Sequence, residues 1–204
     1  MRCEAQTKAG KQCKNTSKTG SRCYQHQTQL EEAEGLNSKI NKEDLRSLFC
    51  DQLSHVNSIL KFKYKLRLPQ FPEYISENMI SHILHKQGII TDWVKKKRGD
   101  LVTSSKEQIE CKCFSSTGPI SFSPTAKWSQ LYILDAQEWR NNFFCLYLID
   151  CDDVEFKNSV MVNEDEFMID QCADIRRPRI TWEKLSPQIE YQIVVKGTFE
   201  DLIG

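Results

Sequence analysis

The sequence of 204 residues has no long apolar run and no excess of either charge. A membrane-spanning helix needs about 18 or more mostly apolar residues in succession, and none occurs, so we expect no membrane span. The opening residues MRCEAQTKAGKQCK hold no apolar run, so we expect no secretory signal. The 28 basic and 28 acidic side chains cancel, which argues against a simple polycationic coat for nucleic acid. Because 39% of the residues are hydrophobic, we expect one folded domain, with or without a small appendage.

Nine cysteines are present, an odd number in a chain without an expected export signal. A reducing, intracellular and therefore cytoplasmic location fits this number better than a disulfide scaffold does. Buried free thiols behave as small hydrophobic groups. We expect such core thiols at Cys50, Cys111, Cys113, Cys145, Cys151 and Cys172.

The other three cysteines lie within the first 26 residues, which contain almost no large apolar side chain. Such a segment either folds around a metal ion or stays disordered, and both interpretations remain open. The spacing C-x9-C-x9-C-x2-H offers three thiolates and one imidazole, the ligand set of a closed, tetrahedral structural zinc site. The candidate Zn²⁺ ligands are Cys3, Cys13, Cys23 and His26. The string is similar to a short Cys3His zinc module at the ends of larger proteins, including some nucleases.

The charge is unevenly distributed along the chain. Residues 1–30 carry six basic side chains and one acidic one, whereas residues 161–204 carry nine acidic and five basic ones. A basic module over residues 1–30 would favour a polyanion, since each phosphate contact by Lys or Arg adds affinity. Its candidate DNA-contacting residues are Lys8, Lys11 and Lys14. The alternative is that these lysines only keep a small surface soluble, and residues 31–41 are expected to be a linker.

Local patterns predict a mixed α/β domain built around a small sheet. Apolar residues recur at helical spacing over residues 41–60 and 72–86, and Gly88 is expected to end the second helix. A third helix is expected over residues 128–139. Strands are expected at residues 101–103, 108–114, 120–122, 143–149 and 190–195.

Two carboxylates and a lysine form a second candidate site. Alternation along a strand places Glu110 and Lys112 on one face and apolar residues on the other. Asp100 precedes this strand and could join Glu110 across a hairpin. Two carboxylates can bind Mg²⁺, which prefers oxygen ligands, while Lys112 could orient the attacking water or stabilise charge on a phosphate. A solvated Glu–Lys pair on a surface hairpin is the alternative.

This arrangement resembles the PD-(D/E)XK nuclease superfamily, the fold of many type II restriction endonucleases. The resemblance implies a restriction-endonuclease-like core, a mixed central sheet flanked by helices, over residues 42–204. It also implies that Asp100 and Glu110 bind Mg²⁺, and that the helix before the sheet adds another acidic residue, for which Glu77 is the candidate. The expected order α-β-β-β-α-β matches the superfamily core, although Gly99 stands where the name-giving motif has proline.

A second Glu-x-Lys sequence, Glu155-Phe156-Lys157, follows several aspartates. We reject it as a catalytic motif because it lies at the polar exit of a strand and not inside one.

The residues around the motif could contact DNA. The loop after it is rich in hydroxyl groups, which can bind phosphates or base edges, and it is similar to a segment of some type II restriction enzymes. A basic run directly before Asp100 could hold the phosphate backbone near the carboxylates. A plain loop and a solvated charged face are the alternatives, and Trp128 and Tyr132 are expected in the core. The candidates for DNA contact are Ser115, Ser116, Ser121, Lys95, Lys96, Lys97 and Arg98.

We therefore expect a Mg²⁺-dependent, site-specific double-stranded DNA endonuclease of a type II restriction system, which leaves 5′-phosphate ends as the resemblance implies. Cutting both strands needs two active sites, which favours a homodimer. Two alternatives stay open. One is a repair or recombination nuclease acting on branched or damaged DNA, and the other is a non-catalytic DNA-binding protein whose working part is the zinc module.

Overall fold

The computed structural model describes residues 40–61, 69–94 and 100–204. The chain separates into two units, Met1–Ser38 and Lys39–Gly204, and every described residue belongs to the second unit. Three groups of predicted residues lie outside the described part and stay predictions. These are the zinc ligands Cys3, Cys13, Cys23 and His26, the lysines Lys8, Lys11 and Lys14, and the basic run Lys95, Lys96, Lys97 and Arg98.

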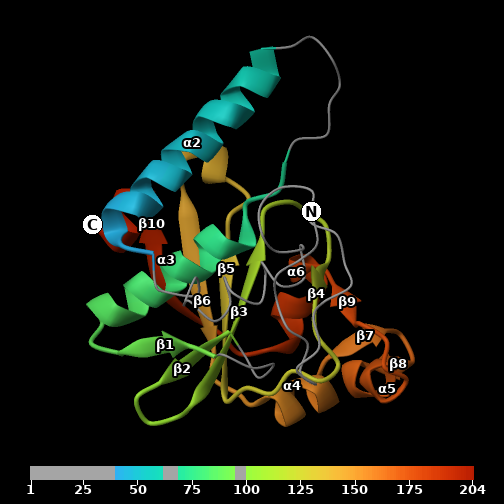
Figure 1. Cartoon of the computed structure of the whole chain (residues 1–204). Helices are drawn as coiled ribbons and strands as arrows, with labels where there is room; N and C mark the ends of the chain where they lie inside the picture. The colour runs from blue at the N-terminus through green and yellow to red at the C-terminus, as the bar shows by residue number, and fades with distance from the viewer. Residues whose placement is uncertain (1–39, 62–68, 95–99) are drawn as a thin grey trace, which may run out of the picture. The chain divides into compact units, whose positions relative to one another are not determined.

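A six-stranded sheet forms the centre of the second unit (Figure 1). The strand order is β1-β2-β3-β5-β6-β10, in which β3 and β5 run parallel and every other neighbouring pair is antiparallel. The strands are β1 (Thr91–Trp93), β2 (Leu101–Thr103), β3 (Gln108–Phe114), β5 (Gln130–Asp135), β6 (Phe144–Ile149) and β10 (Gln192–Gly197). The predicted mixed α/β class with a central mixed sheet is therefore confirmed.

Three helices pack against one face of this sheet: α2 (Lys42–Lys61), α3 (Glu73–Lys86) and α7 (Phe199–Ile203). Their buried side chains share one core cluster with Cys111 of β3 and with Tyr132 and Leu134 of β5. The rings of Phe49 and Phe199 stack with centroids 4.4 Å apart and so join α2 to α7. Since α2 and α3 match the two helices expected at residues 41–60 and 72–86, those predictions are confirmed.

The other face carries shorter elements and a second core cluster. Leu131 and Ile133 of β5 point into this cluster, as does Trp128, which is 3% exposed. Tyr132 is also 3% exposed, so the core positions expected for Trp128 and Tyr132 are confirmed. The elements on this side are β4 (Ile120–Ser121), α4 (Asp153–Ser159), β7 (Met161–Asn163), β8 (Glu166–Phe167), α5 (Met168–Ala173), β9 (Arg179–Ile180) and α6 (Trp182–Leu185). Two short 3-10 helices, Trp139–Asn141 and Ser186–Gln188, complete the described elements.

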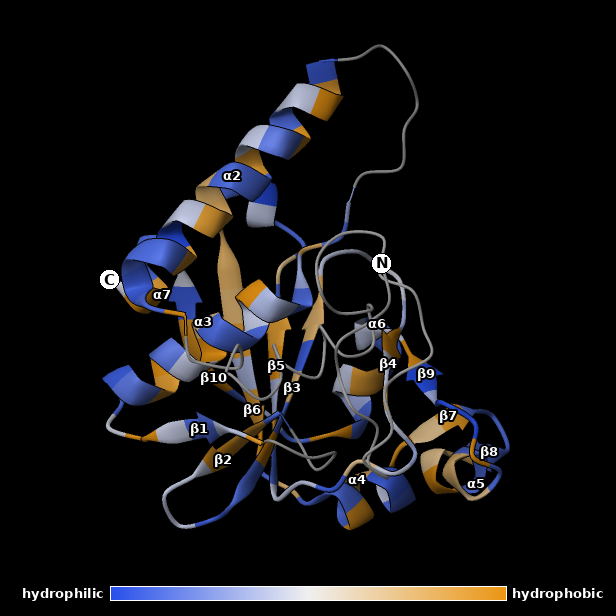
Figure 2. Ribbon diagram, in the orientation of Figure 1, coloured by the Kyte–Doolittle hydropathy of each residue, from blue (hydrophilic) through white to orange (hydrophobic). Residues whose placement is uncertain are grey.

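The helix predicted over residues 128–139 is wrong. Residues 130–135 form β5, which lies between β3 and β6 in the middle of the sheet. The residues Leu131 to Leu134 are all buried and alternate between the two core clusters, and the central strands are strongly apolar (Figure 2). A strand covered on both faces has a continuous apolar run, which periodicity alone does not separate from a buried helix. Residues 115–129, all described, contain no helix, so the expected order α-β-β-β-α-β is wrong at its second helix.

The described cysteines carry free thiols. Cys111 and Cys145 are buried and three others are half-buried, but Cys50 is exposed on α2, so the prediction of a core thiol is wrong for Cys50. Within residues 40–61, 69–94 and 100–204, no helix is long and apolar enough to cross a membrane.

Candidate active site

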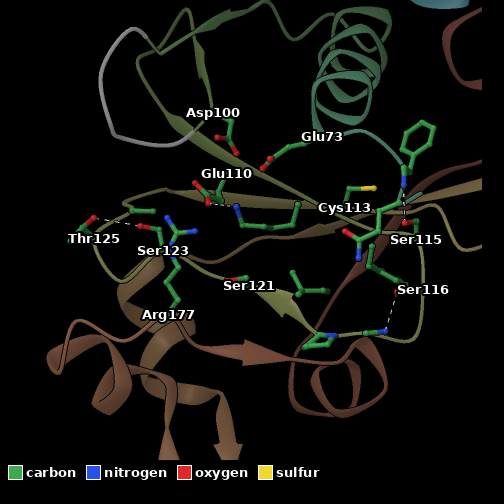
Figure 3. A pocket seen from close by; sticks show the side chains of 18 residues that line it. Glu73, Asp100, Glu110, Cys113, Ser115, Ser116, Ser121, Ser123, Thr125 and Arg177 are labelled. Atoms are coloured by element: carbon green, nitrogen blue, oxygen red, sulfur yellow. Dashed lines mark hydrogen bonds and ion pairs between the residues drawn. The ribbon is translucent and has the colours of Figure 1, made fainter. Parts of the chain in front are cut away.

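A cavity of about 830 Å³ opens beside β3. One wall consists of the N-terminal end of α3 and the β2–β3 hairpin, and the other consists of the loop from residue 115 to residue 126 together with Arg177. Figure 3 shows the carboxylates of Glu73, Asp100 and Glu110 pointing toward one another, with Arg177 reaching toward them from the opposite wall. The predicted residues Asp100, Glu110 and Lys112 thus line one cavity.

The β2–β3 hairpin fixes Asp100 beside Glu110. The two strands pair with Leu101 opposite Ile109, and Asp100 directly precedes β2. The backbone N–H of Asp100 donates to the carbonyl of Ile109 over 2.9 Å, and Oδ2 of Asp100 accepts a bond of 2.8 Å from the N–H of Cys111. The second bond orients the carboxylate and uses one of its two oxygens. Asp100 therefore lies beside Glu110 in one hairpin, directly before the first residue of β2.

Glu110 and Lys112 project from one face of β3, while Ile109 and Cys111 on the reverse face belong to the core. Nζ of Lys112 lies 2.6 Å from Oε1 of Glu110, and the side chains are 14% and 4% exposed. Burial by itself would lower the pKa of Lys112, but the attraction of Glu110 and Asp100 outweighs it and raises that pKa. The lysine therefore carries its positive charge at neutral pH.

Helix α3 contributes two further carboxylates. Glu77, predicted from the sequence, is half-buried, and burial together with the negative charges of Asp100 and Glu73 raises its pKa to about 8. Glu73, one helical turn earlier, lines the cavity directly and was missed by sequence reasoning. Glu73 could have been identified from its position four residues before Glu77, because this spacing places both side chains on one face of a helix.

Burial, and next the charge of Glu110, raises the pKa of Asp100 to about 6. Four carboxylates thus lie around a single lysine, and burial first, then their mutual repulsion, raises the pKa of two of them. Hard carboxylate oxygens with excess negative charge fit a divalent cation such as Mg²⁺, which usually keeps several waters and takes one or two protein carboxylates. Within the described residues, no group of three or more His, Cys, Asp or Glu side chains lies close enough to hold a metal ion, so a cation here would have one or two carboxylates as ligands and water as the others.

The three predicted loop serines all line the cavity. Oγ of Ser115 accepts a bond of 3.0 Å from the N–H of Phe71, and Oγ of Ser116 accepts one of 3.2 Å from the N–H of Gly118. Ser121 lies on β4, opposite Arg179 of β9. The first two hydroxyls thus help to shape the loop, and contact of the serines with DNA stays a prediction.

The rejected Glu-x-Lys sequence lies on α4, away from the cavity lining. Nζ of the buried Lys157 donates to the carbonyl of Ala126 over 2.7 Å and pairs with Asp153 over 3.1 Å. It also lies 4.9 Å from the ring centroid of Trp128. Lys157 therefore has a structural role, joining α4 to the loop at Ala126, whereas Lys112 faces the cavity.

A family model for restriction endonucleases matches residues 23–186, about four fifths of the chain and all of the cavity lining. The protein is therefore a type II restriction endonuclease, an enzyme that hydrolyses phosphodiester bonds in DNA. More specifically, the chain belongs to the Bsp6I restriction endonuclease family. No curated protein matches the chain. Family membership favours a restriction enzyme over a repair nuclease or a non-catalytic DNA-binding protein.

Proposed function

We propose that this restriction endonuclease cuts both strands of a specific DNA site in a Mg²⁺-dependent reaction, with a catalytic centre of the PD-(D/E)XK kind. The observation that carries the proposal is the hairpin that brings Asp100, Glu110 and Lys112 into one cavity. Asp100 and Glu110 would hold the cation, and Glu77 would add negative charge from α3. When bound, Mg²⁺ would supply Lewis acidity and lower the pKa of a bound water.

Each side chain has a definite task in this proposal. The bond from the N–H of Cys111 holds the Asp100 carboxylate in a fixed orientation. Lys112 holds Glu110 through its ion pair and presents a buried positive charge at the cavity, where it can donate to a phosphate oxygen or to the attacking water. Glu77, with its pKa near 8, keeps a proton at neutral pH while the cavity lacks a cation.

The proposed superfamily membership depends on the hairpin and not on the order of the elements. Residues 115–129 contain no helix, so the chain departs from α-β-β-β-α-β after the motif strand. The departure leaves β3 and β5 parallel and adjacent, and β3 still displays Glu110 and Lys112 at the cavity. The active-site geometry therefore depends on β2, β3 and α3.

Two further parts of the proposal concern assembly. Cutting two strands of a duplex requires two active sites, so a homodimer on a palindromic site is the simplest arrangement. The N-terminal segment would form a zinc module over residues 1–30 that helps to hold DNA, joined by residues 31–41 to the nuclease domain at 42–204. Its ligands would be Cys3, Cys13, Cys23 and His26.

The first experiment is plasmid digestion with Mg²⁺ or with EDTA, using wild type and Asp100→Asn. We expect discrete bands with Mg²⁺ only, and a cleavage rate at least about 10²-fold lower for Asp100→Asn, as for loss of one electrostatic group in an active site. Cleavage confined to branched or damaged DNA would instead favour the repair nuclease. Undiminished cleavage in EDTA would contradict the Mg²⁺ dependence.

The chemistry of the ends is tested by ligation. If the products carry 5′-phosphate and 3′-hydroxyl groups, DNA ligase will rejoin the fragments without any kinase treatment. Fragments that rejoin only after kinase treatment would contradict the proposed 5′-phosphate ends.

A further inference from the structure

We propose that Arg177 binds a backbone phosphate of the DNA strand that enters the carboxylate cavity. This inference rests on the proposed function, since it takes the cavity beside Glu110 as the place where the strand is cut. Two cations line the cavity in the described part of the chain, Lys112 and Arg177, and they differ in their partners. Lys112 is paired with Glu110 at 2.6 Å. Arg177 is exposed and makes no ion pair or hydrogen bond within the described residues.

The charges around the cavity favour a cation on the wall opposite the carboxylates. Glu73, Asp100 and Glu110 face the cavity, and a phosphodiester brings further negative charge toward them. A guanidinium on the opposite wall can take two phosphate oxygens at once, because its donors form a planar fork. Figure 3 shows Arg177 extending toward Ser123 and Glu110 from the side opposite the β2–β3 hairpin. A phosphate between the two walls would therefore meet carboxylates on one side and Arg177 on the other.

The backbone before Arg177 is fixed in an unusual conformation. Ile175 has a φ of +58°, which a β-branched residue rarely adopts, and it is 78% exposed. Arg176 holds this turn by pairing with Glu166 over 2.5 Å and with Asp174 over 3.0 Å. The turn after α5 thus uses one arginine to anchor the chain and leaves the next one to face the cavity.

The backbone after Arg177 is fixed as well. The carbonyl of Pro178 accepts a bond of 3.0 Å from the N–H of Phe122, which ties this segment to the loop that carries Ser121 and Ser123. Both serines line the cavity next to Arg177. Since the backbone is held on each side, a phosphate contact would cost mainly the ordering of one side chain.

Arg179 provides a matched control. It lies two residues further along the same segment, is also exposed, and does not line the cavity. A loss of DNA affinity that came only from reduced positive charge would be equal for Arg177→Ala and Arg179→Ala. A phosphate contact in the cavity predicts a loss at Arg177 alone.

The test measures binding of wild type, Arg177→Ala, Arg177→Lys and Arg179→Ala to a labelled duplex. The duplex carries the sequence that wild type cuts, which is located by sequencing the ends of a digest. Titrations are done in EDTA at several NaCl concentrations. We expect Arg177→Ala to bind at least about 10-fold more weakly than wild type. The slope of the logarithm of the association constant against log [NaCl] should become smaller in magnitude by about one. Arg177→Lys should keep the slope with weaker binding, and Arg179→Ala should match wild type.

An unchanged slope for Arg177→Ala, or an equal loss for Arg179→Ala, would overturn the inference. Because binding is measured without a divalent cation, its outcome is separate from catalysis. If Glu110→Gln still cuts DNA at the wild-type rate while binding by Arg177→Ala depends less on salt, the assignment of the catalytic carboxylates is wrong and the phosphate contact is supported. If Glu110→Gln is inactive and Arg177→Ala keeps its slope, the inference alone fails.

Discussion

Nζ of Lys112 lies 2.6 Å from Oε1 of Glu110, and both side chains are almost fully buried at the edge of the cavity. A buried ion pair adds little net stability, because the cost of removing two charges from water offsets their attraction. The pair is therefore better explained by chemistry than by folding. Its position on a strand whose reverse face is core keeps both groups aimed at the cavity.

Replacing Lys112 with Gln should impair the chemical step more than DNA binding. We expect kcat to fall by about 10²- to 10³-fold, as for other losses of charge stabilisation at a reacting group, with only a small change in KM. Lys184→Gln is the control, because Lys184 is exposed and lies outside the cavity lining. Wild-type kcat in Lys112→Gln would rule out its catalytic role.

The stability of the metal-free enzyme should depend on pH through Glu77. The pKa of Glu77 rises from an ordinary value of 4.5 to about 8, so the folded protein keeps a proton that the unfolded chain loses. Stability therefore falls as the pH rises through this window. In EDTA, the Tm of Glu77→Gln should fall less than that of wild type between about pH 5 and about pH 8. At the upper end, the corresponding difference in the free energy of unfolding should be ~1–3 kcal/mol after solvent screening.

The matched control for this pH experiment is Glu155→Gln, since Glu155 is exposed on α4. It should retain the wild-type slope of Tm against pH. If Glu77→Gln and Glu155→Gln give the same slope, Glu77 does not carry a raised pKa. Asp100, whose pKa is raised to about 6, should account for part of the slope that remains in Glu77→Gln.

Substitutions of the lysines in the two Glu-x-Lys sequences should have opposite effects: one should mainly lower stability and the other should mainly slow cleavage. Lys157→Met removes a buried ammonium that bonds to Ala126 and pairs with Asp153, and we expect a loss of ~3–5 kcal/mol in the free energy of unfolding. Lys112→Gln should change the free energy of unfolding less, because the Glu110 carboxylate that it leaves unpaired lines the cavity and can take up a proton, and it should slow cleavage by about 10²- to 10³-fold. Urea denaturation compares the two variants directly, and equal destabilisation would show that Lys112 also has mainly a structural task.

The proposed zinc module predicts about one tightly held zinc ion per chain. Cys13→Ser and Cys23→Ser should each lower the zinc content measured by metal analysis, because each removes one of four ligands. Cys50→Ser is the control, since its exposed thiol lies on α2 outside the module. A purified wild-type protein that contains no zinc would contradict the proposed module.

The sequence predicted those features that depend on neighbouring residues. Asp100, Glu110 and Lys112 lie within one hairpin, so strand alternation placed Glu110 and Lys112 on one face and the expected hairpin added Asp100; the structure shows all three in the lining of one cavity. β5 was predicted as a helix because burial on two faces removes the alternation that identifies a strand. Whether the predicted residues bind metal or DNA stays a prediction.

Arg177 could not be assigned from local patterns. It reaches the cavity because β9 pairs with β4, and that contact joins segments far apart in the chain. Its segment, Arg176-Arg177-Pro178-Arg179, stands out as basic within an acidic end, but nothing local shows which arginine faces the cavity. Glu73, by contrast, could have been predicted from the sequence, because it lies one helical turn before Glu77.

The central claim is that Glu110 belongs to the catalytic centre, and single-turnover cleavage of a plasmid with Mg²⁺ tests it most directly. Glu110→Gln keeps the size of the side chain and removes its charge, and Glu155→Gln makes the same change in the Glu-x-Lys sequence on α4. The account predicts that Glu110→Gln cuts at least about 10²-fold more slowly than wild type, while Glu155→Gln cuts at the wild-type rate. Wild-type cleavage by a folded Glu110→Gln enzyme would contradict the account.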